Sequence, residues 1–111
     1  MSIVWGDISF DGPYPITDWN PPYCAVIYVI MHKPDYVNEP KKFRLLYIGG
    51  LFNLSDRRFY REQDKYNCWI KEADSEDNLY IGIHKMPNST ADERIKIESN
   101  LINQYNPVCN Q

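Results

Sequence analysis

The chain has 111 residues, an apolar content of 43% and nine tyrosines, which together exclude a disordered or low-complexity protein. Its net charge of −3 on its face argues against a nucleic-acid partner, because binding phosphates requires cations. No apolar run approaches the roughly 20 residues that span a bilayer, and the acidic N-terminus lacks the basic region of a signal peptide. The sequence therefore predicts a cytoplasmic protein with no membrane partner.

The three cysteines, Cys24, Cys68 and Cys109, are an odd number at wide spacing. This pattern argues against a disulfide framework and favours a reducing compartment. A structural zinc site is not expected either, because only His32 and His84 accompany the cysteines and no C-x-x-C or H-x-x-x-H pair is present.

The charge is distributed unevenly along the chain. Residues 41–71 carry eight Lys and Arg against three acids, a local charge of +5, whereas residues 1–40 and 72–111 each carry −4. A basic middle between two acidic flanks favours one anion-facing surface. A solvated helix that happens to be basic accounts for the charge equally well.

Residues 1–23 are rich in Pro, Gly, Asp and aromatic residues. They predict an N-terminal arm or loop that covers the core of a domain at 24–111. The aromatic residues that would cover this core are Trp5, Phe10, Tyr14 and Trp19.

The β-branched run at 25–30 predicts a buried strand, and the run at 43–48, closed by two glycines, predicts its antiparallel partner. Asn53 is a suitable N-cap for a helix that runs to Lys65. The remaining predicted elements are a helical turn at 68–71 around Trp69, a third strand at 79–83, and a helix at 91–105 that ends before Pro107. The predicted fold is α+β in the order β-β-α-α-β-α, with a small three-stranded, mainly antiparallel sheet flanked by helices.

The last predicted helix carries a carboxylate, Glu98, on its apolar side. At about 100° per residue, Glu98 falls near the middle of the apolar arc. A buried carboxylate costs roughly several kcal/mol unless it is paired or binds a metal. Arg94, one turn earlier, can supply an ion pair; the alternative is a metal-binding carboxylate at the rim of a cleft. The arc consists of Ala91, Ile95, Ile97, Leu101, Ile102 and Tyr105.

Several short motifs occur in a defined order. Val26-Ile27-Tyr28 and Tyr47-Ile48-Gly49 fall on the two paired strands, and Arg57 follows ten positions after Tyr47. The chain then closes with E-x-x-L-I-x-x-x-x-P-x-x-N from Glu98 to Asn110. Together these motifs resemble the GIY-YIG nuclease family over residues 24–110. A second Y-I-G at 80–82 lacks the partners and is interpreted as the third strand only.

The resemblance implies a metal-dependent DNA endonuclease that hydrolyses phosphodiester bonds. It implies that Glu98 holds one Mg²⁺ or Mn²⁺ ion, that Arg57 clamps the phosphate, that Tyr28 helps to activate water, and that Tyr47 positions the water or the phosphate. Asn110 is expected to order the glutamate helix and the strand ends. The residues expected to contact substrate are Lys42, Arg58, Arg61 and Asn110.

Two positions depart from the family pattern. Val26 stands where the first glycine is usual, and Gly50 stands where a lysine often follows the second motif, which removes one way to lower a tyrosine pKa. These departures favour an alternative function, a catalytically degenerate module that binds nucleic acid or a protein partner without cleavage. A third hypothesis is a plain α+β interaction domain that binds a partner protein through Trp5, Phe10 and Trp19.

The sequence leaves the source of DNA specificity open. The two motif strands are separated by eighteen residues between Tyr28 and Tyr47, a longer connection than is usual in the family. Such an insertion can carry DNA contacts or be a tolerated extension of the hairpin. Because the chain has no room for a second DNA-binding domain, specificity is expected from the arm at 1–23, the insertion at 31–42, a homo-oligomer or a protein partner.

Overall fold

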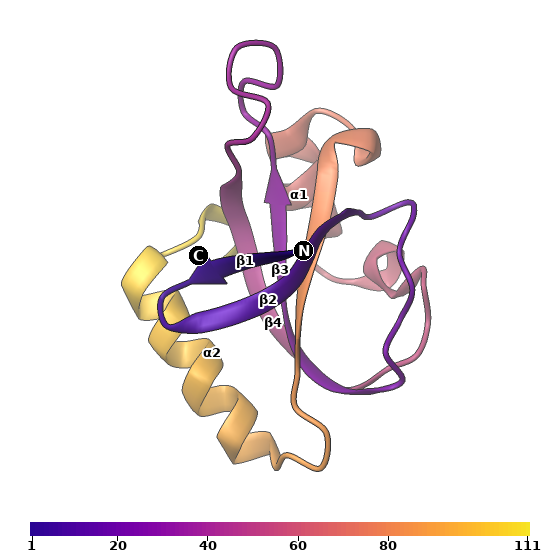
Figure 1. Cartoon of the computed structure of the whole chain (residues 1–111), viewed down its shortest axis with the longest axis vertical. Coiled ribbons are helices and arrows are strands. Elements are labelled where there is room, and N and C mark those ends of the chain that lie inside the picture. Colours follow the sequence, from indigo (N-terminus) through magenta and orange to yellow (C-terminus); the bar gives the residue numbers. More distant parts are fainter.

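The computed structural model describes all 111 residues and is an α+β protein, as the sequence predicts (Figure 1). The elements, in chain order, are β1 (Ser2–Trp5), β2 (Ile8–Pro15), β3 (Cys24–His32), β4 (Arg44–Leu54), the 3₁₀ helix η1 (Phe59–Glu62), α1 (Tyr66–Ala73), η2 (Glu76–Asn78), β5 (Leu79–Lys85), α2 (Ala91–Tyr105) and η3 (Val108–Asn110). None of these helices has both the length and the apolar character needed to traverse a bilayer.

All strands belong to one antiparallel sheet of five strands, in the order β1-β2-β5-β3-β4. The predicted number of three strands is wrong, because residues 1–23 contribute β1 and β2 rather than only a covering loop. The two strands are joined by Gly6-Asp7, and Gly6 has φ +61°, which suits a tight hairpin turn. The buried Phe10 and Trp19 do cover the core. The division of the chain at residue 23 stays a prediction.

The three strands predicted from the central sequence are present, but β4 is longer than expected. Its glycines do not close it: β4 continues to Leu54, whose carbonyl accepts the Tyr23 N–H and which pairs in register with Cys24. The predicted helix from Asn53 to Lys65 is therefore wrong. Pairing with β3 keeps residues 51–54 extended, and sheet contacts outweigh the local capping signal. The expected helical turn around Trp69 is confirmed as part of α1, with Trp69 fully buried.

The two α-helices lie on opposite faces of the sheet (Figure 1). On the α1 face, Val26, Tyr28 and Ile30 of β3 pack in one cluster with Trp69 of α1. On the α2 face, the alternate β3 residues Ile27, Val29 and Met31 pack with Ile48 and with Leu101 of α2. The alternation follows the two-residue period of a strand. β3 lies between β5 and β4 and is buried along almost its whole length.

Helix α2 spans the predicted residues, but its buried side is rotated from the predicted arc. Thr90 and Glu93 form a capping box at its N-terminus. The buried residues are Arg94 and Leu101, whereas Ile95 is 56% exposed. Arg94, Leu101 and the half-buried residues Ile97 and Glu98 recur at helical spacing and define the side that faces the sheet.

The C-terminal residues are fastened to the rest of the molecule by a disulfide. Cys68 of α1 and Cys109 of η3 are bonded, 41 positions apart in the sequence, and Cys24 is the only free cysteine. The expectation of no disulfide framework is therefore wrong for this pair, and the bond does not fit the predicted reducing compartment. The odd number of cysteines concealed one pair and one free thiol.

Candidate active site

Tyr28 and Tyr47 lie together on the α1 face. Their strands are paired, and their ring centroids are 6.1 Å apart. Tyr28 is almost fully buried, with only 1% of its surface exposed, whereas Tyr47 is half-buried. Burial raises the pKa of Tyr28 well above its ordinary range, and the negative charges of Tyr47 and Glu98 raise it further. Burial and the charge of Glu98 also raise the pKa of Tyr47. Both phenols are therefore protonated at neutral pH.

Gly49 makes room for the first of these tyrosines. A Cβ atom at this position would lie 2.6 Å from the Tyr28 hydroxyl oxygen and 2.7 Å from the ring carbon that carries it. The Tyr28 ring thus lies directly over the backbone of Gly49. The second glycine of the pair faces the opposite side of the strand, as successive residues in a strand do.

Glu98 approaches Gly50 from the α2 face. A Cβ atom on Gly50 would lie 3.1 Å from Glu98 Oε2 and 3.3 Å from Cδ1 of Ile27. The Glu98 side chain is half-buried, and burial raises the pKa of its carboxyl group. It forms neither a hydrogen bond nor an ion pair with any protein group. Glu98 is an acid that the fold partly desolvates and leaves unpaired.

The ion pair between Arg94 and Glu98 that the sequence left open is not formed. The Arg94 guanidinium instead donates to the Ser89 carbonyl at 2.8 Å and to the Ser89 hydroxyl at 2.9 Å. It also lies 5.9 Å from the centroid of the Phe52 ring. Both possible partners lie within five residues of Arg94, so sequence spacing alone does not decide between them. The carboxylate of Glu98 remains free for another cation.

The phenols and the carboxylate lie on the two sides of the Gly49-Gly50 segment. β4 is the edge strand of the sheet, so this segment has a strand partner on one side only. The charge of Glu98 nevertheless raises the pKa of both Tyr28 and Tyr47. Tyr28 and Tyr47 on one side and Glu98 on the other therefore flank one short stretch of edge strand.

Asn110 clamps the free edge of β4 next to Tyr47. Its amide oxygen accepts the Ile48 N–H at 2.9 Å, and its amide nitrogen donates to the Ile48 carbonyl at 2.9 Å. The side chain thus replaces a neighbouring strand at this residue. Asn110 orders the strand end, which is one of the two roles expected for it. A contact between Asn110 and substrate stays a prediction.

The predicted arginine site is only partly assembled. Arg57 lies in the turn before η1 and not in a helix; it is exposed and donates to Asn20 Oδ1 at 3.1 Å. It forms no hydrogen bond or ion pair with Glu98 or with either tyrosine. Asn20 belongs to the loop after β2, and its proximity to Arg57 was not visible in the sequence.

The side chains of the other residues expected to bind substrate differ in whether they form ion pairs. Arg61 is held by Glu76, with Nε 3.1 Å from Oε1, and Lys42 pairs loosely with Glu39 at 3.5 Å. Arg58 is exposed, and its side chain forms no ion pair. None of these three cations forms an ion pair with a residue of the Gly49-Gly50 segment or with Glu98.

A small acidic hollow at Tyr47 is not predicted by the sequence pattern. This hollow has a volume of about 340 Å³ and is lined by Tyr47 together with Glu62, Gln63, Asp64 and Lys65. The charge of Asp64 contributes to the raised pKa of Tyr47. The region had been assigned to a helix, so these residues were not expected to face the tyrosine.

Glu98 is the only carboxylate of the motif set, and no group of three or more His, Cys, Asp or Glu residues is positioned to hold a metal. A single carboxylate fits Mg²⁺, which keeps most of its waters and binds through one or two carboxylates together with substrate phosphates. The half-buried, unpaired Glu98 side chain meets that requirement.

Comparison of the chain with protein-family models, curated proteins and solved structures finds no match. The function is therefore inferred from the motifs and from the geometry around Gly49 and Gly50.

Proposed function

We propose that this protein is a metal-dependent DNA endonuclease of the GIY-YIG type. The observation that carries the proposal is the state of Glu98: its carboxylate is half-buried, free of protein partners, and packed against Gly50 directly after the Tyr47-Ile48-Gly49 motif. A fold that desolvates a carboxylate without pairing it loses stability unless another cation binds there. Such residues concentrate at functional sites.

The order of elements supports the same proposal. The two motif strands β3 and β4 form an antiparallel hairpin, helical segments follow, β5 pairs with the other side of β3, and the glutamate helix α2 comes last. The order agrees with the β-β-α-α-β-α expected of the family only if the 3₁₀ helix η1 takes the place of the first helix, because α1 is the one α-helix between β4 and β5. β1 and β2 extend that arrangement at the far edge of the sheet.

Each group around the Gly49-Gly50 segment has a distinct role in this proposal. Glu98 holds the metal. A Mg²⁺ or Mn²⁺ ion held there would supply neutralisation of charge on a phosphate oxygen and a water of lowered pKa. Tyr47, with its half-exposed ring, orients the water or the phosphate through its hydroxyl group. Tyr28 is buried and its raised pKa keeps the phenol un-ionised at neutral pH, so it is not available as a general base and instead positions Tyr47.

Arg57 clamps the phosphate after leaving its present partner. Its bond to Asn20 is a single hydrogen bond from the guanidinium to a neutral amide oxygen at an exposed position, where water can replace it. A guanidinium–phosphate pair is stronger than the bond that it replaces. The proposal therefore requires the Arg57 side chain to turn towards the substrate when DNA binds.

The test is cleavage of supercoiled plasmid in Mg²⁺ or Mn²⁺ by the wild type and by Glu98→Gln. The wild type is expected to yield nicked or linear DNA. Glu98→Gln preserves the size of the side chain against Gly50 but weakens the metal site, and should lower the rate by at least about 100-fold. The matched control is Asp92→Asn, which removes an exposed carboxylate from the same helix and should cleave as the wild type does.

Two results would contradict the proposal. One is a wild-type protein that leaves duplex, nicked and branched DNA intact in Mn²⁺. The other is cleavage by Glu98→Gln at the wild-type rate, which would assign the activity to a contaminant or to a different site.

The alternative function is a degenerate module of the same type that binds nucleic acid or a protein without cutting. The observation that favours it is the enclosure of Tyr28 together with the absence of a lysine side chain at Gly50. No neighbouring cation lowers the pKa of either tyrosine. In this case the protein binds DNA without cutting it, and Glu98→Ala leaves the DNA as the wild type does.

A further inference from the structure

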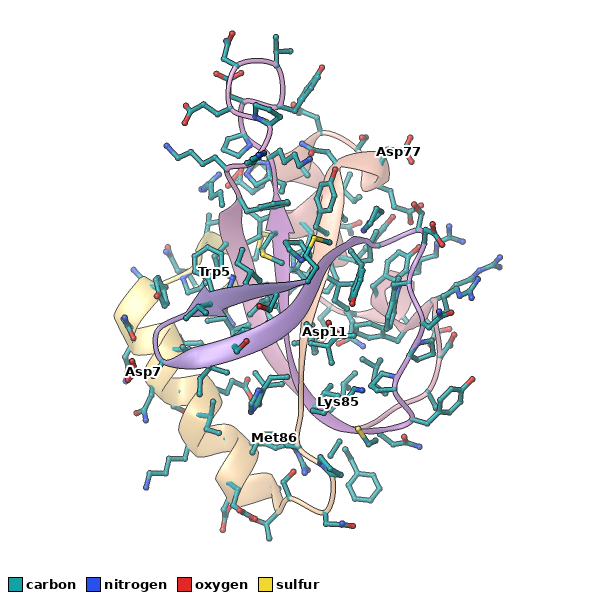
Figure 2. All side chains as sticks on the ribbon, in the orientation of Figure 1. Trp5, Asp7, Asp11, Asp77, Lys85 and Met86 are labelled. Atoms are coloured by element: carbon teal, nitrogen blue, oxygen red, sulfur yellow. A yellow bond between two sulfur atoms is a disulfide. The ribbon has the colours of Figure 1, made fainter.

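A second surface region combines aromatic rings with cations. It is a groove of about 660 Å³ at the end of the molecule where β1, the start of β4 and the C-terminal end of α2 meet. Figure 2 shows Trp5 beside the C-terminal part of α2. We call this feature the Trp5–Phe43 groove. The lining side chains used below are Trp5, Lys42, Phe43, Arg44 and Tyr105.

The lining of the Trp5–Phe43 groove contains two cationic side chains and no Asp or Glu. This is unusual for a chain with a net charge of −3. Other surface hollows of this protein are lined by acids, namely Asp11 and Asp18, Glu62 and Asp64, or Asp77. The groove is therefore a place where the overall negative charge does not repel an anionic ligand.

The two cations have only weak protein partners. Lys42 lies 3.5 Å from Glu39, with both side chains more than half exposed, and Arg44 lies 3.9 Å from Glu72. Exposed ion pairs of this kind stabilise a protein by about 1 kcal/mol or less. A phosphate can therefore replace these acids at little cost, and an arginine can bind it with two hydrogen bonds.

The aromatic rings are held in place by their neighbours. Trp5 packs edge-on against Tyr105, with ring centroids 5.4 Å apart, and the Gly6 N–H donates to the Tyr105 hydroxyl. Phe43 packs edge-on against Tyr80 at 5.0 Å, and the Lys33 ammonium lies 5.4 Å from the Phe43 centroid. Fixed rings that alternate with cations are the surface on which unpaired bases stack while their phosphates are neutralised.

We propose that the Trp5–Phe43 groove binds an unpaired segment of the DNA strand that the protein cleaves. The proposal rests on the proposed function and adds a substrate class, namely DNA with a single-stranded segment next to the cut. A duplex does not fit this chemistry, because its bases are already stacked and paired.

The position of the groove agrees with this role. Tyr105 lies two turns beyond Glu98 along α2, a distance of about 10 Å at the rise of a helix. On β4, Gly50, which packs against Glu98, lies six residues beyond Arg44, about 20 Å at the rise of a strand. Both elements therefore lead from the groove directly to the Glu98 site.

The experiment measures binding without cleavage. Fluorescence anisotropy is recorded in EDTA at low salt with a labelled oligothymidylate of about 15 nucleotides and with a blunt duplex of equal length. The wild type should bind the single strand more tightly than the duplex. The double variant Lys42→Gln/Arg44→Gln should bind the single strand at least about ten-fold more weakly.

The matched control is Lys71→Gln/Lys96→Gln, which removes the same charge from exposed positions on α1 and α2 that do not line the groove. It should bind the single strand within about two-fold of the wild type, since only general attraction is lost. Trp5→Leu tests the stacking contribution and should weaken binding by roughly five-fold or more. Circular dichroism establishes that each variant is folded.

The inference is overturned if the wild type prefers the duplex, if it binds neither ligand, or if both double variants lose affinity equally. These outcomes can be separated from failure of the nuclease. Groove-dependent binding without any metal-dependent cleavage retains the groove and rejects the nuclease. If Glu98→Gln abolishes cleavage and the groove variants do not change binding, the nuclease is retained and the groove is rejected.

Discussion

The two sides of the Gly49-Gly50 segment differ in what their glycines make possible. On the α1 face, Gly49 lets the Tyr28 ring lie against the strand, where Tyr28 packs edge-on with Phe59 at 5.1 Å and is almost fully buried. On the α2 face, Gly50 leaves space for the half-exposed and unpaired carboxylate of Glu98. The same residue type therefore serves packing on one side and leaves a reactive group accessible on the other. At this segment the buried Tyr28 ring therefore contributes mainly to stability, whereas Glu98 on the other side is the unpaired acid proposed to hold the metal.

The largest expected effect on stability concerns the disulfide that joins α1 to the C-terminal 3₁₀ helix η3. Reduction, or the variant Cys68→Ser/Cys109→Ser, frees η3 from α1 and should lower the free energy of unfolding by about 2–4 kcal/mol, because the bond closes a long loop in the unfolded chain. Urea unfolding with and without reductant measures the loss. The variant Cys24→Ser, which alters the free cysteine, is the control and should respond to reductant as the wild type does.

An equal response of the wild type and the double variant to reductant would show that this bond does not form. No covalent bond would then link α1 to η3. Asn110 would still clamp Ile48 through its two hydrogen bonds.

The next effect compares the two glycines directly. Gly49→Ala forces a methyl group to within 2.6–2.9 Å of the rigid, buried Tyr28 ring and should destabilise the protein by about 1–3 kcal/mol. Gly50→Ala meets the flexible end of Glu98 at 3.1 Å, so its effect should be smaller. The difference between the two urea midpoints measures the asymmetry of the strand. Equal destabilisation by both variants would contradict the tighter packing on the Gly49 side of this segment.

Sequence reasoning recovered the elements whose signal is local. The β-branched run of β3, the capped helix α2 and the Trp69 turn each carry their pattern within a few residues. The turn at Gly6-Asp7 had a local signal as well, but the many prolines and glycines of residues 1–23 concealed it. β1 and β2 were missed for that reason.

The errors at the site have a different cause, because they concern contacts between distant residues. Asn53 resembles a helix cap, yet pairing with β3 keeps it in β4. Arg94 is the exception, because its error is local: its guanidinium bonds Ser89, five positions earlier, rather than Glu98. The bond between Cys68 and Cys109 and the bond between Arg57 and Asn20 join positions 41 and 37 residues apart, and no spacing rule predicts them.

The smallest expected effect concerns the unpaired acid on the α2 face. Because burial raises the pKa of Glu98 above the value of 4.5 for a free side chain, the folded state favours the protonated carboxyl. The stability that protonation provides is fully present below pH 4.5 and is lost as the pH rises through the folded-state pKa. Glu98→Gln should therefore be slightly more stable than the wild type at pH 7, and this advantage should disappear near pH 4.

Saturating Mg²⁺ should stabilise the wild type at pH 7 and leave Glu98→Gln nearly unchanged, because only the carboxylate binds the ion well. Thermal unfolding of both proteins at the two pH values, with and without Mg²⁺, tests the prediction. A wild type that is more stable than Glu98→Gln at pH 7 without metal would show that the carboxylate has a protein partner in solution, and the contrast between the two faces would no longer hold.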